Sequence, residues 1–268
     1  MNEQQQEGVG RVVLITGGSS GVGAAVARRL SAQGAAVLVN YSRDAALARQ
    51  VVAQCEALGA QALAVQGDVA RDADCVGLVD AAVGRWGRLD ALVNCAGTTQ
   101  FVPMAQLDDV RAEDFQRIYG VNAVGPFQMA RAAARQMSEG SAIVNVSSIA
   151  GQIGSGSSFP YVMSKAALNI LTIGLARVLA PRIRVNAVLP GLIEGRWMRD
   201  GLGEAMYERV KSQYAAASAL GRVSDPNHIA SAVCWLLAPD CLATGQQIVV
   251  DAGFVLGKLP SAAGPVRA

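Results

Sequence analysis

The chain has 268 residues, which is enough for one large α/β domain with a well-buried core and rather short for two. The net charge of +2, without any block of like charges, argues against a nucleic-acid partner and against binding to a membrane surface. Hydrophobic residues make up 51% and charged residues only 16%, an apolar balance that indicates helices buried on more than one face and therefore an oligomer.

The reactive residue types exclude several kinds of site. Five widely spaced cysteines without a Cys-x-x-Cys pair favour reduced thiols in a cytoplasmic protein. His228 is the only histidine, which argues against a histidine-based metal site and against a Ser-His-Asp triad, so we expect no metal. The polar N-terminus predicts no signal peptide, and no uninterrupted apolar run is expected to reach membrane-spanning length.

Short apolar runs alternate with helical patterns along the first hundred residues. Because the runs lack polar alternation, they predict a parallel sheet covered on both faces. The predicted strands cover 11–16, 35–41, 62–66 and 89–94, and the predicted helices cover 24–33, 44–58 and 72–86.

The same alternation continues to the end of the chain. The expected elements are a long helix over 109–137, a strand over 142–147, a helix over 161–179, a strand over 184–189, a helix starting at Asp225-Pro226 and a strand over 247–250. We therefore predict a single-domain, Rossmann-like α/β fold: a doubly wound parallel sheet of about seven strands with helices on both faces. The domain is expected to cover 11–257, with a substrate flap at about 191–220, a flexible N-terminus over 1–10 and a tail over 258–268.

A glycine-rich loop at 16–23 joins the first strand to its helix. Glycines permit a tight turn and a close approach of backbone to phosphate, and the helix N-terminus then offers unpaired N–H groups to the anion. A plain tight turn is the alternative, but the position at the first strand-to-helix junction favours a dinucleotide site. The candidate ligands are Gly17, Ser19, Ser20, Gly21, Val22 and Gly23.

The spacing Gly-x-x-x-Gly-x-Gly resembles the short-chain dehydrogenase/reductase family, and later strand ends extend the resemblance. The segment 94–97 is similar to the Asn-Asn-Ala-Gly of the family, with cysteine in second place, which implies that Asn94, Ala96 and Gly97 lie near the adenosine. Asp68 and Val69 match the adenine contact of the family, although Asp68 could equally cap a helix.

A catalytic set follows the predicted fifth strand. Tyr161 and Lys165 are four residues apart, so they share one face of a helix, and the cation is expected to lower the pKa of the phenol. Tyr207 and Lys211 have the same spacing, but only Tyr161 has a serine, Ser148, thirteen residues upstream at a strand end. We therefore interpret Tyr207 and Lys211 as an ordinary exposed helix pair.

The resemblance implies a role for each residue of the set. Ser148 donates to the substrate carbonyl oxygen, Tyr161 protonates it, and Lys165 lowers the pKa of the tyrosine and binds the nicotinamide ribose. Asn122, which in the family locally bends the long helix, holds a water in a proton relay. Ser147 is the neighbouring serine that could be mistaken for the catalytic one, and its side chain is expected to point to the opposite face of the strand.

The loop after the predicted sixth strand resembles the nicotinamide loop of the family through Pro190, Gly191 and Ile193. Gly195 stands where the family usually has a threonine that contacts the nicotinamide carboxamide. Other groups must therefore hold the carboxamide. The flap that follows carries Trp197, which could line an apolar pocket or serve simple packing. The segments flanking the last strand resemble the pattern that supports tetramer contacts, and we expect a homotetramer or a homodimer.

The end of the second strand bears on the choice of cofactor. NAD-using members usually carry an aspartate where Tyr41 stands, and Ser42 and Arg43 follow it, which favours NADP(H) over NAD(H). Asp44 is the nearest carboxylate that would oppose a 2′-phosphate, and Ser20 lacks the basic character frequent in NADP users.

The whole pattern is most similar to 3-oxoacyl-[acyl-carrier-protein] reductases and implies a small carbonyl or alcohol substrate. Two alternatives stay open: an NAD-dependent alcohol, sugar or steroid dehydrogenase, and a non-catalytic dinucleotide-binding regulator.

Overall fold

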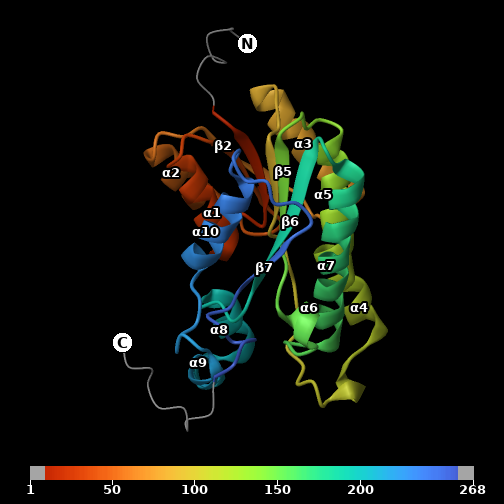
Figure 1. Cartoon of the computed structure of the whole chain (residues 1–268), viewed down its shortest axis with the longest axis vertical. Helices are drawn as coiled ribbons and strands as arrows, with labels where there is room; N and C mark the ends of the chain where they lie inside the picture. The colour runs from red at the N-terminus through yellow and green to blue at the C-terminus, as the bar shows by residue number, and fades with distance from the viewer. Residues whose placement is uncertain (1–9, 259–268) are drawn as a thin grey trace.

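Seven parallel strands form one sheet in the order β3-β2-β1-β4-β5-β6-β7 (Figure 1). The computed structural model describes residues 10–258, so the predicted N-terminal segment up to residue 9 and the tail from 259 lie outside the described residues. The strands are β1 (Val12–Thr16), β2 (Ala36–Tyr41), β3 (Ala62–Gln66), β4 (Ala91–Asn94), β5 (Ser141–Val146), β6 (Ile183–Pro190) and β7 (Gln247–Val250). The strand order reverses between β1 and β4, which confirms the predicted doubly wound fold and places a ligand crevice at that point.

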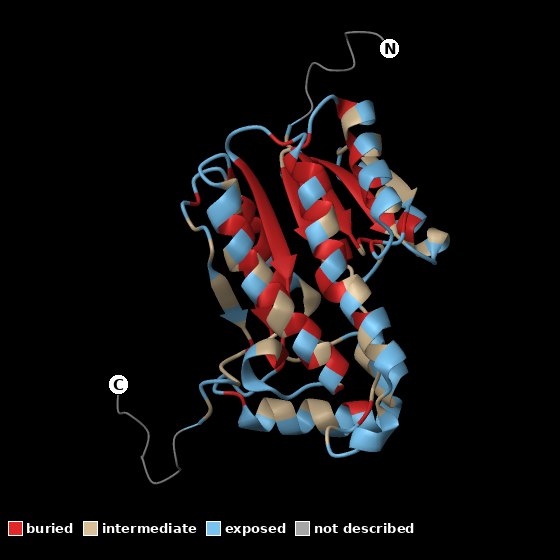
Figure 2. Ribbon diagram, turned by 90° about the vertical axis from the view of Figure 1, so that its right-hand side faces the viewer, coloured by how far each residue is buried: buried red, intermediate tan, exposed pale blue. Residues whose placement is uncertain are grey.

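The central strands are buried on both faces, as their continuous apolar sequence predicts (Figure 2). On one face, β1 and β2 pack against α1 (Gly21–Ser31), α2 (Ala45–Ala57) and α10 (Pro226–Leu237). The opposite face is covered by α3 (Asp72–Trp86), α5 (Gly125–Ala134) and α7 (Phe159–Leu179). The sheet thus holds its strand ends rigidly between two apolar layers.

The predicted long helix over 109–137 is wrong as a single element. A 3-10 turn (Leu107–Asp109) precedes α4 (Ala112–Tyr119), a π-helical turn (Gly120–Val124) follows it, and α5 then continues to Ala134. Pro126 lacks an N–H and its ring crowds the carbonyl of residue 122, so a regular helix cannot pass through this point. π turns of this kind are frequent at functional sites, and this one carries Asn122.

The segment over 191–220 contains two helices, α8 (Arg196–Leu202) and α9 (Glu204–Ala217), which lie beyond the carboxyl ends of the strands (Figure 1). Gly203 separates them with a φ of 76°, a left-handed conformation that favours glycine. The expectation of an exposed Tyr207 is wrong: its side chain is 1% exposed, and the guanidinium of Arg199 lies 4.8 Å from its ring centroid. Tyr207 is buried because it supplies the apolar body that the flap helices pack around.

Helix α7 is long and apolar, although Lys165 and Arg177 interrupt its apolar sequence. Its 21 residues include a window of mean hydropathy 1.5, and by length and composition alone it could cross a membrane. In the structure it packs against β6 and α4, and 44% of that window is buried. Its apolar character therefore serves the core on one side, while Met163, Ile170 and Val178 remain exposed on the other.

Candidate active site

The glycine loop after β1 is compact because side chains would not fit. A Cβ on Gly17 would lie 2.8 Å from the Cα of Ala96, and one on Gly23 would lie 2.5 Å from the carbonyl oxygen of Gly17. A Cβ on Gly21 would meet nothing within 4 Å, so the loop opens to free space there. Helix α1 begins at Gly21, and the side chain of Ser20 does not cap it. The first N–H groups of α1 are therefore available to an anion, and the loop fits a diphosphate.

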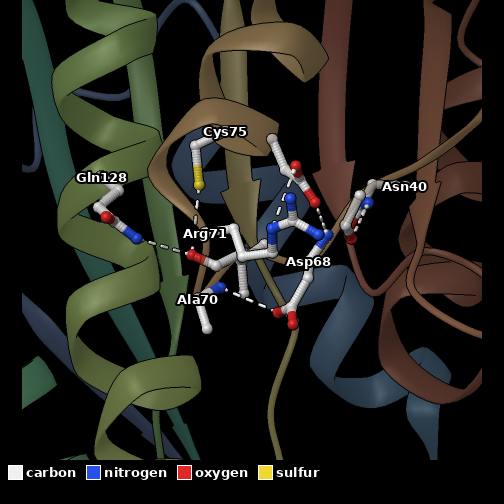
Figure 3. Close-up of polar contacts among 9 residues, drawn as sticks. Asn40, Asp68, Ala70, Arg71, Cys75 and Gln128 are labelled. Carbon is white, nitrogen blue, oxygen red and sulfur yellow. Dashed lines mark hydrogen bonds and ion pairs between the residues drawn. The ribbon is translucent and has the colours of Figure 1, made fainter.

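Asn40 is a candidate site residue that the sequence reasoning missed. Its Oδ1 accepts a hydrogen bond from the N–H of Gly17 at 3.2 Å, and its Nδ2 donates to the carbonyl of Gly67 at 3.0 Å. The side chain is 2% exposed and ties the glycine loop to the loop after β3. Figure 3 shows it next to the loop after β3. The available signal was a polar residue near the end of an otherwise apolar buried strand, because a buried amide needs specific partners.

The loop after β3 holds Asp68 at the surface. Its Oδ1 accepts from the N–H of Ala70 at 3.0 Å, and its own N–H donates to Asp74 at 2.9 Å (Figure 3). Helix α3 begins only at Asp72 with Arg71 as N-cap, so the alternative that Asp68 caps this helix is wrong. The carbonyl of Val69 accepts from Gln128 of α5 at 2.9 Å, which anchors this loop to that helix. The exposed Asp68 carboxylate is thus rigidly presented.

The end of β2 fits a phosphate-bearing ribose. Tyr41 is half-buried, while Ser42 and Arg43 are exposed. The opposing carboxylate of Asp44 caps α2 by accepting from the N–H of Leu47 at 3.0 Å. Both Arg43 and Asp44 are exposed at this edge, and the hydrogen bond to Leu47 directs the Asp44 carboxylate toward the start of α2.

The segment after β4 meets the catalytic residues through its backbone. The Nδ2 of Asn94 donates to the Oδ1 of Asn145 at 2.9 Å, so this side chain braces β4 against β5 in the interior. Gly97 lies where a Cβ would stand 3.6 Å from the Oδ1 of Asn122 and 3.9 Å from the Nζ of Lys165. Two residues predicted from different segments therefore converge on this glycine.

Ser148 and Tyr161 are brought together by close packing of α6 (Ala150–Ile153) on α7. A Cβ on Gly151 would lie 2.5 Å from the backbone N of Ala166, so only glycine allows this approach. The hydroxyl of Ser148 lies near that of Tyr161 and favours its phenolate form, which lowers the pKa of the tyrosine. The other serine, Ser147, is buried and donates to the carbonyl of Lys165 at 3.2 Å. Ser148 is thus the serine that accompanies the phenol.

Lys165 lies beneath Tyr161 on the next turn of α7. Its Nζ is 5.7 Å from the centroid of the tyrosine ring and donates to the carbonyl of Val146 at 3.0 Å. Burial lowers the pKa of Lys165 to about 8, although the neighbouring Cys95 opposes this shift. Desolvation of the ammonium therefore places its titration close to neutral pH.

The expected lowering of the tyrosine pKa is wrong for this structure. Burial raises the pKa of Tyr161 to about 12, and the nearby hydroxyl of Ser148 only partly opposes that rise. Desolvation raises the pKa because the phenolate would lose its hydration. The phenol consequently keeps its proton at neutral pH.

Asn122 occupies the π turn, where the backbone places its side chain toward the site. Its Oδ1 accepts from the N–H of Thr98 at 2.8 Å, and its Nδ2 donates to the carbonyl of Thr98 at 2.9 Å. A further hydrogen bond of 3.0 Å joins Nδ2 to the Oγ of Ser164, which in turn donates to the carbonyl of Tyr161 at 2.7 Å. Asn122 thereby links the segment after β4 to α7.

The loop after β6 forms the base of the flap. Pro190 accepts from Ser148 at 3.5 Å, and a Cβ on Gly191 would lie 1.8 Å from the hydroxyl of Tyr214, so this position also requires glycine. Ile193 pairs with Ser224 in an isolated bridge. Gly195, in the place of the usual threonine, is the N-cap of α8. From α8, the ring of Trp197 meets Tyr161 edge-on at 6.2 Å between centroids.

Comparison with known proteins places this geometry in a family. The family model described as "Enoyl-(Acyl carrier protein) reductase" matches residues 17–255. An oxidoreductase of Methylorubrum extorquens described as uncharacterized is 39% identical over 261 residues, covering 96% of this chain and 98% of that protein. A 3-oxoacyl-[acyl-carrier-protein] reductase of Synechocystis sp. is 32% identical over 251 residues, covering 92% and 97%. A short-chain dehydrogenase from Burkholderia cenocepacia, solved in complex with NADP, is 34% identical with a TM-score of 0.84 and covers 92% and 99%.

Proposed function

The chain belongs to the short-chain dehydrogenase/reductase family of oxidoreductases, and we propose that it reduces a ketone with NADPH, Tyr161 being the proton donor. The observation that carries this proposal is the meeting of Ser148 and Tyr161 next to the buried ammonium of Lys165, whose Nζ lies 5.7 Å from the tyrosine ring centroid. Two hydroxyl donors and a cation at one strand end match the needs of a carbonyl oxygen that becomes an alkoxide.

The crevice at the strand reversal is the proposed cofactor site, and NADPH bound there would supply the hydride. The open N-terminus of α1 suits the diphosphate, and Lys165 faces the proposed nicotinamide end. The proposed ligands are Gly17, Ser19, Ser20, Gly21, Val22, Gly23, Tyr41, Ser42, Arg43, Asp68, Val69, Asn94, Ala96, Gly97, Tyr161, Lys165, Pro190, Gly191 and Ile193. Asn94 would act through its backbone, because its side chain binds Asn145.

The proposed chemistry of the side chains is proton transfer and charge stabilisation. Ser148 orients the carbonyl oxygen by a hydrogen bond, and Tyr161 donates its proton to that oxygen. A pKa of about 12 keeps Tyr161 protonated at neutral pH, which suits a donor in the direction of reduction. Lys165 stabilises the phenolate that remains after the transfer, because its cation lies under the ring.

Asn122 is proposed to complete the set by positioning water that returns the proton. Its amide is held by the backbone of Thr98 and by Ser164, so it cannot rotate away from the site. The neighbouring Gly97 leaves space between Asn122 and Lys165. A proton that leaves Tyr161 would be replaced through this region.

The preference for NADP(H) over NAD(H) is proposed from the end of β2. Ser42 and Arg43 are exposed there, whereas Asp44 is committed to capping α2. The alternative, an NAD-dependent alcohol, sugar or steroid dehydrogenase, predicts tighter binding of NADH. Titration of both reduced cofactors decides between them, and equal or stronger NADH binding contradicts the proposal.

The proposed assembly is a homotetramer or homodimer of one catalytic domain with a flap over 191–220. The exposed outer face of α7, with Met163, Ile170 and Val178, supports burial against another copy. All five cysteines are free, which supports the proposed cytoplasmic location. Solution scattering with a monomer mass would contradict the oligomer.

The central experiment replaces Tyr161 with Phe and follows NADPH consumption with a panel of ketones. Tyr161→Phe is expected to abolish turnover while NADPH binding persists, because only the proton donor is lost. Tyr207→Phe is the matched control and should keep its activity. Retained turnover in Tyr161→Phe contradicts the catalytic assignment. Tight NADPH binding without turnover of any carbonyl by the wild type would favour the non-catalytic regulator instead.

A further inference from the structure

We infer that Trp197 and Phe101 form an aromatic wall beside Tyr161 that selects ketones carrying an aromatic ring next to the carbonyl. The inference rests on the proposed reductase function and deepens it by naming the substrate class. It concerns the flap helix α8 and the segment after β4, whose side chains the proposed proton transfer does not use.

The first observation is the contact between Trp197 and Tyr161. Their ring centroids are 6.2 Å apart with an interplanar angle of 70°, an edge-to-face arrangement. Trp197 is 51% exposed, so much of the indole surface is free to meet a ligand. An aromatic surface thus lies beside the hydroxyl that is proposed to protonate the substrate.

The second observation is the packing of Phe101 on helix α8. A Cβ on Gly201 would lie 1.9 Å from the Cε2 of Phe101, so the phenyl ring packs directly on the backbone of α8. Gly201 and Trp197 are four residues apart and share one face of α8. Phe101 and Trp197 therefore lie along the same side of the helix, which is the side turned to Tyr161.

Both ends of this wall are held in place. Next to Phe101, the N–H of Val102 donates to the carbonyl of Ser157 at 2.9 Å, and the hydroxyls of Thr99 and Ser157 are 2.6 Å apart. At the start of the flap, the N–H of Glu194 donates to the carbonyl of Ser224 at 2.8 Å. The aromatic residues are consequently attached to anchored backbone, which lets them discriminate between substrates.

The charges of α8 favour a neutral substrate group over an anionic one. Arg196 pairs with Asp200 at 3.6 Å, and Arg199 pairs with Glu204 at 3.0 Å while lying over the ring of Tyr207. These guanidinium groups are already engaged with carboxylates. The wall therefore offers aromatic surface and dispersion contacts, which suit an aryl group.

The test compares acetophenone with cyclohexyl methyl ketone, two methyl ketones that differ in whether the six-membered ring is aromatic. The readout is the ratio of their kcat/KM values with NADPH, measured for the wild type, Trp197→Ala and Trp197→Phe. Loss of an aromatic contact should lower the aryl preference about three- to tenfold in Trp197→Ala, while Trp197→Phe retains most of it. Trp235→Ala is the matched control, because Trp235 is similarly exposed, at 54%, but lies on α10.

The outcomes separate this inference from the proposed function. An unchanged ratio in Trp197→Ala, with activity that still depends on Tyr161, overturns the aromatic wall and leaves the reductase standing. Activity that survives Tyr161→Phe overturns the proposed function instead. If the wild type reduces neither ketone, calorimetric dissociation constants with NADPH present replace kcat/KM, and an aryl preference unchanged by Trp197→Ala again overturns the inference.

Discussion

Two tyrosines of this chain are followed four residues later by a lysine, and the structure surrounds the two pairs differently. Tyr161 is half-buried at the end of the sheet with the hydroxyl of Ser148 nearby, while Tyr207 is 1% exposed within the flap. Burial lowers the pKa of Lys165 to about 8, whereas the hydrogen bond and the charge of Glu194 raise the pKa of Lys211. Identical spacing thus yields opposite electrostatics.

The two pairs also differ in the residue thirteen positions upstream of each tyrosine. Ser148 stands at the end of a buried strand and supplies a neutral hydroxyl, whereas Glu194 lies in the flap and supplies a carboxylate 3.2 Å from Lys211. The pKa of Lys165 falls because its ammonium is buried, while the pKa of Lys211 rises because Glu194 pairs with it. The comparison shows that this spacing specifies chemistry only in combination with its surroundings.

After Tyr161→Phe, the largest effect is expected from Ser148→Ala. Removing one donor to a developing oxyanion typically costs about a hundredfold to a thousandfold in kcat. NADPH affinity should stay within a few fold, because Ser148 is assigned to the substrate oxygen. Steady-state kinetics and a fluorescence titration of NADPH check both parts, and wild-type kcat would refute the role of Ser148.

The two lysines should differ in how activity depends on pH. Lys165 loses its proton as the pH rises through about 8, so kcat/KM for NADPH, which reports the free enzyme, should fall about tenfold per unit above that pH. Lys211→Met should leave this profile unchanged. A profile flat to pH 10 in the wild type would show that the charge of Lys165 is dispensable.

The contribution of Lys165 to stability should rise with pH, whereas its contribution to activity should fall. Its folded pKa of about 8 lies below the ordinary 10.5, so the unfolded chain binds more protons between these values. Lys165 therefore contributes a rise in the free energy of unfolding with pH across that window, while the buried thiols of Cys75, Cys95 and Cys234, whose pKa values are raised by burial, contribute a fall above their ordinary pKa of 9. Urea unfolding of the wild type and of Lys165→Met at several pH values isolates the lysine contribution, and an equal pH dependence in both proteins would contradict it.

Asn40 lies at the proposed cofactor crevice, which borders Tyr161 and Lys165 and does not border Tyr207 and Lys211. Asn40→Ala leaves the N–H of Gly17 and the carbonyl of Gly67 without their partner, a loss of about 1–3 kcal/mol in loop stability. We expect the dissociation constant of NADPH to rise about tenfold, with a smaller change in kcat. Asn227→Ala, at the exposed start of α10, is the control. An unchanged affinity for NADPH in Asn40→Ala would contradict a role of the Asn40 hydrogen bonds in cofactor binding.

The smallest effect is expected at the second pair. Glu194→Gln removes the ion pair between Glu194 and Lys211. Both side chains are partly exposed, so the change should cost about 0–1 kcal/mol of stability. Ketone reduction should be unaffected. A large loss of kcat would mean that the flap pair contributes to the reaction and would break the comparison.

The fold and the catalytic set were largely predictable from sequence because both depend on local patterns. Continuous apolar runs specify strands of a parallel sheet, and glycines after β1 specify the tight turn. The spacing of Ser148, Tyr161 and Lys165 follows from one strand end and one helix face. Such features need no knowledge of distant contacts.

The tertiary structure alone decided features that join distant segments. Asn40 reaches Gly17 across 23 residues, and Trp197 meets Tyr161 from another element. The burial of Tyr207 and the rise in the pKa of Tyr161 depend on what packs over them, which no spacing encodes. Sequence by itself determined which residues stand at the strand ends, while packing determined their solvation and hence the protons they hold at neutral pH.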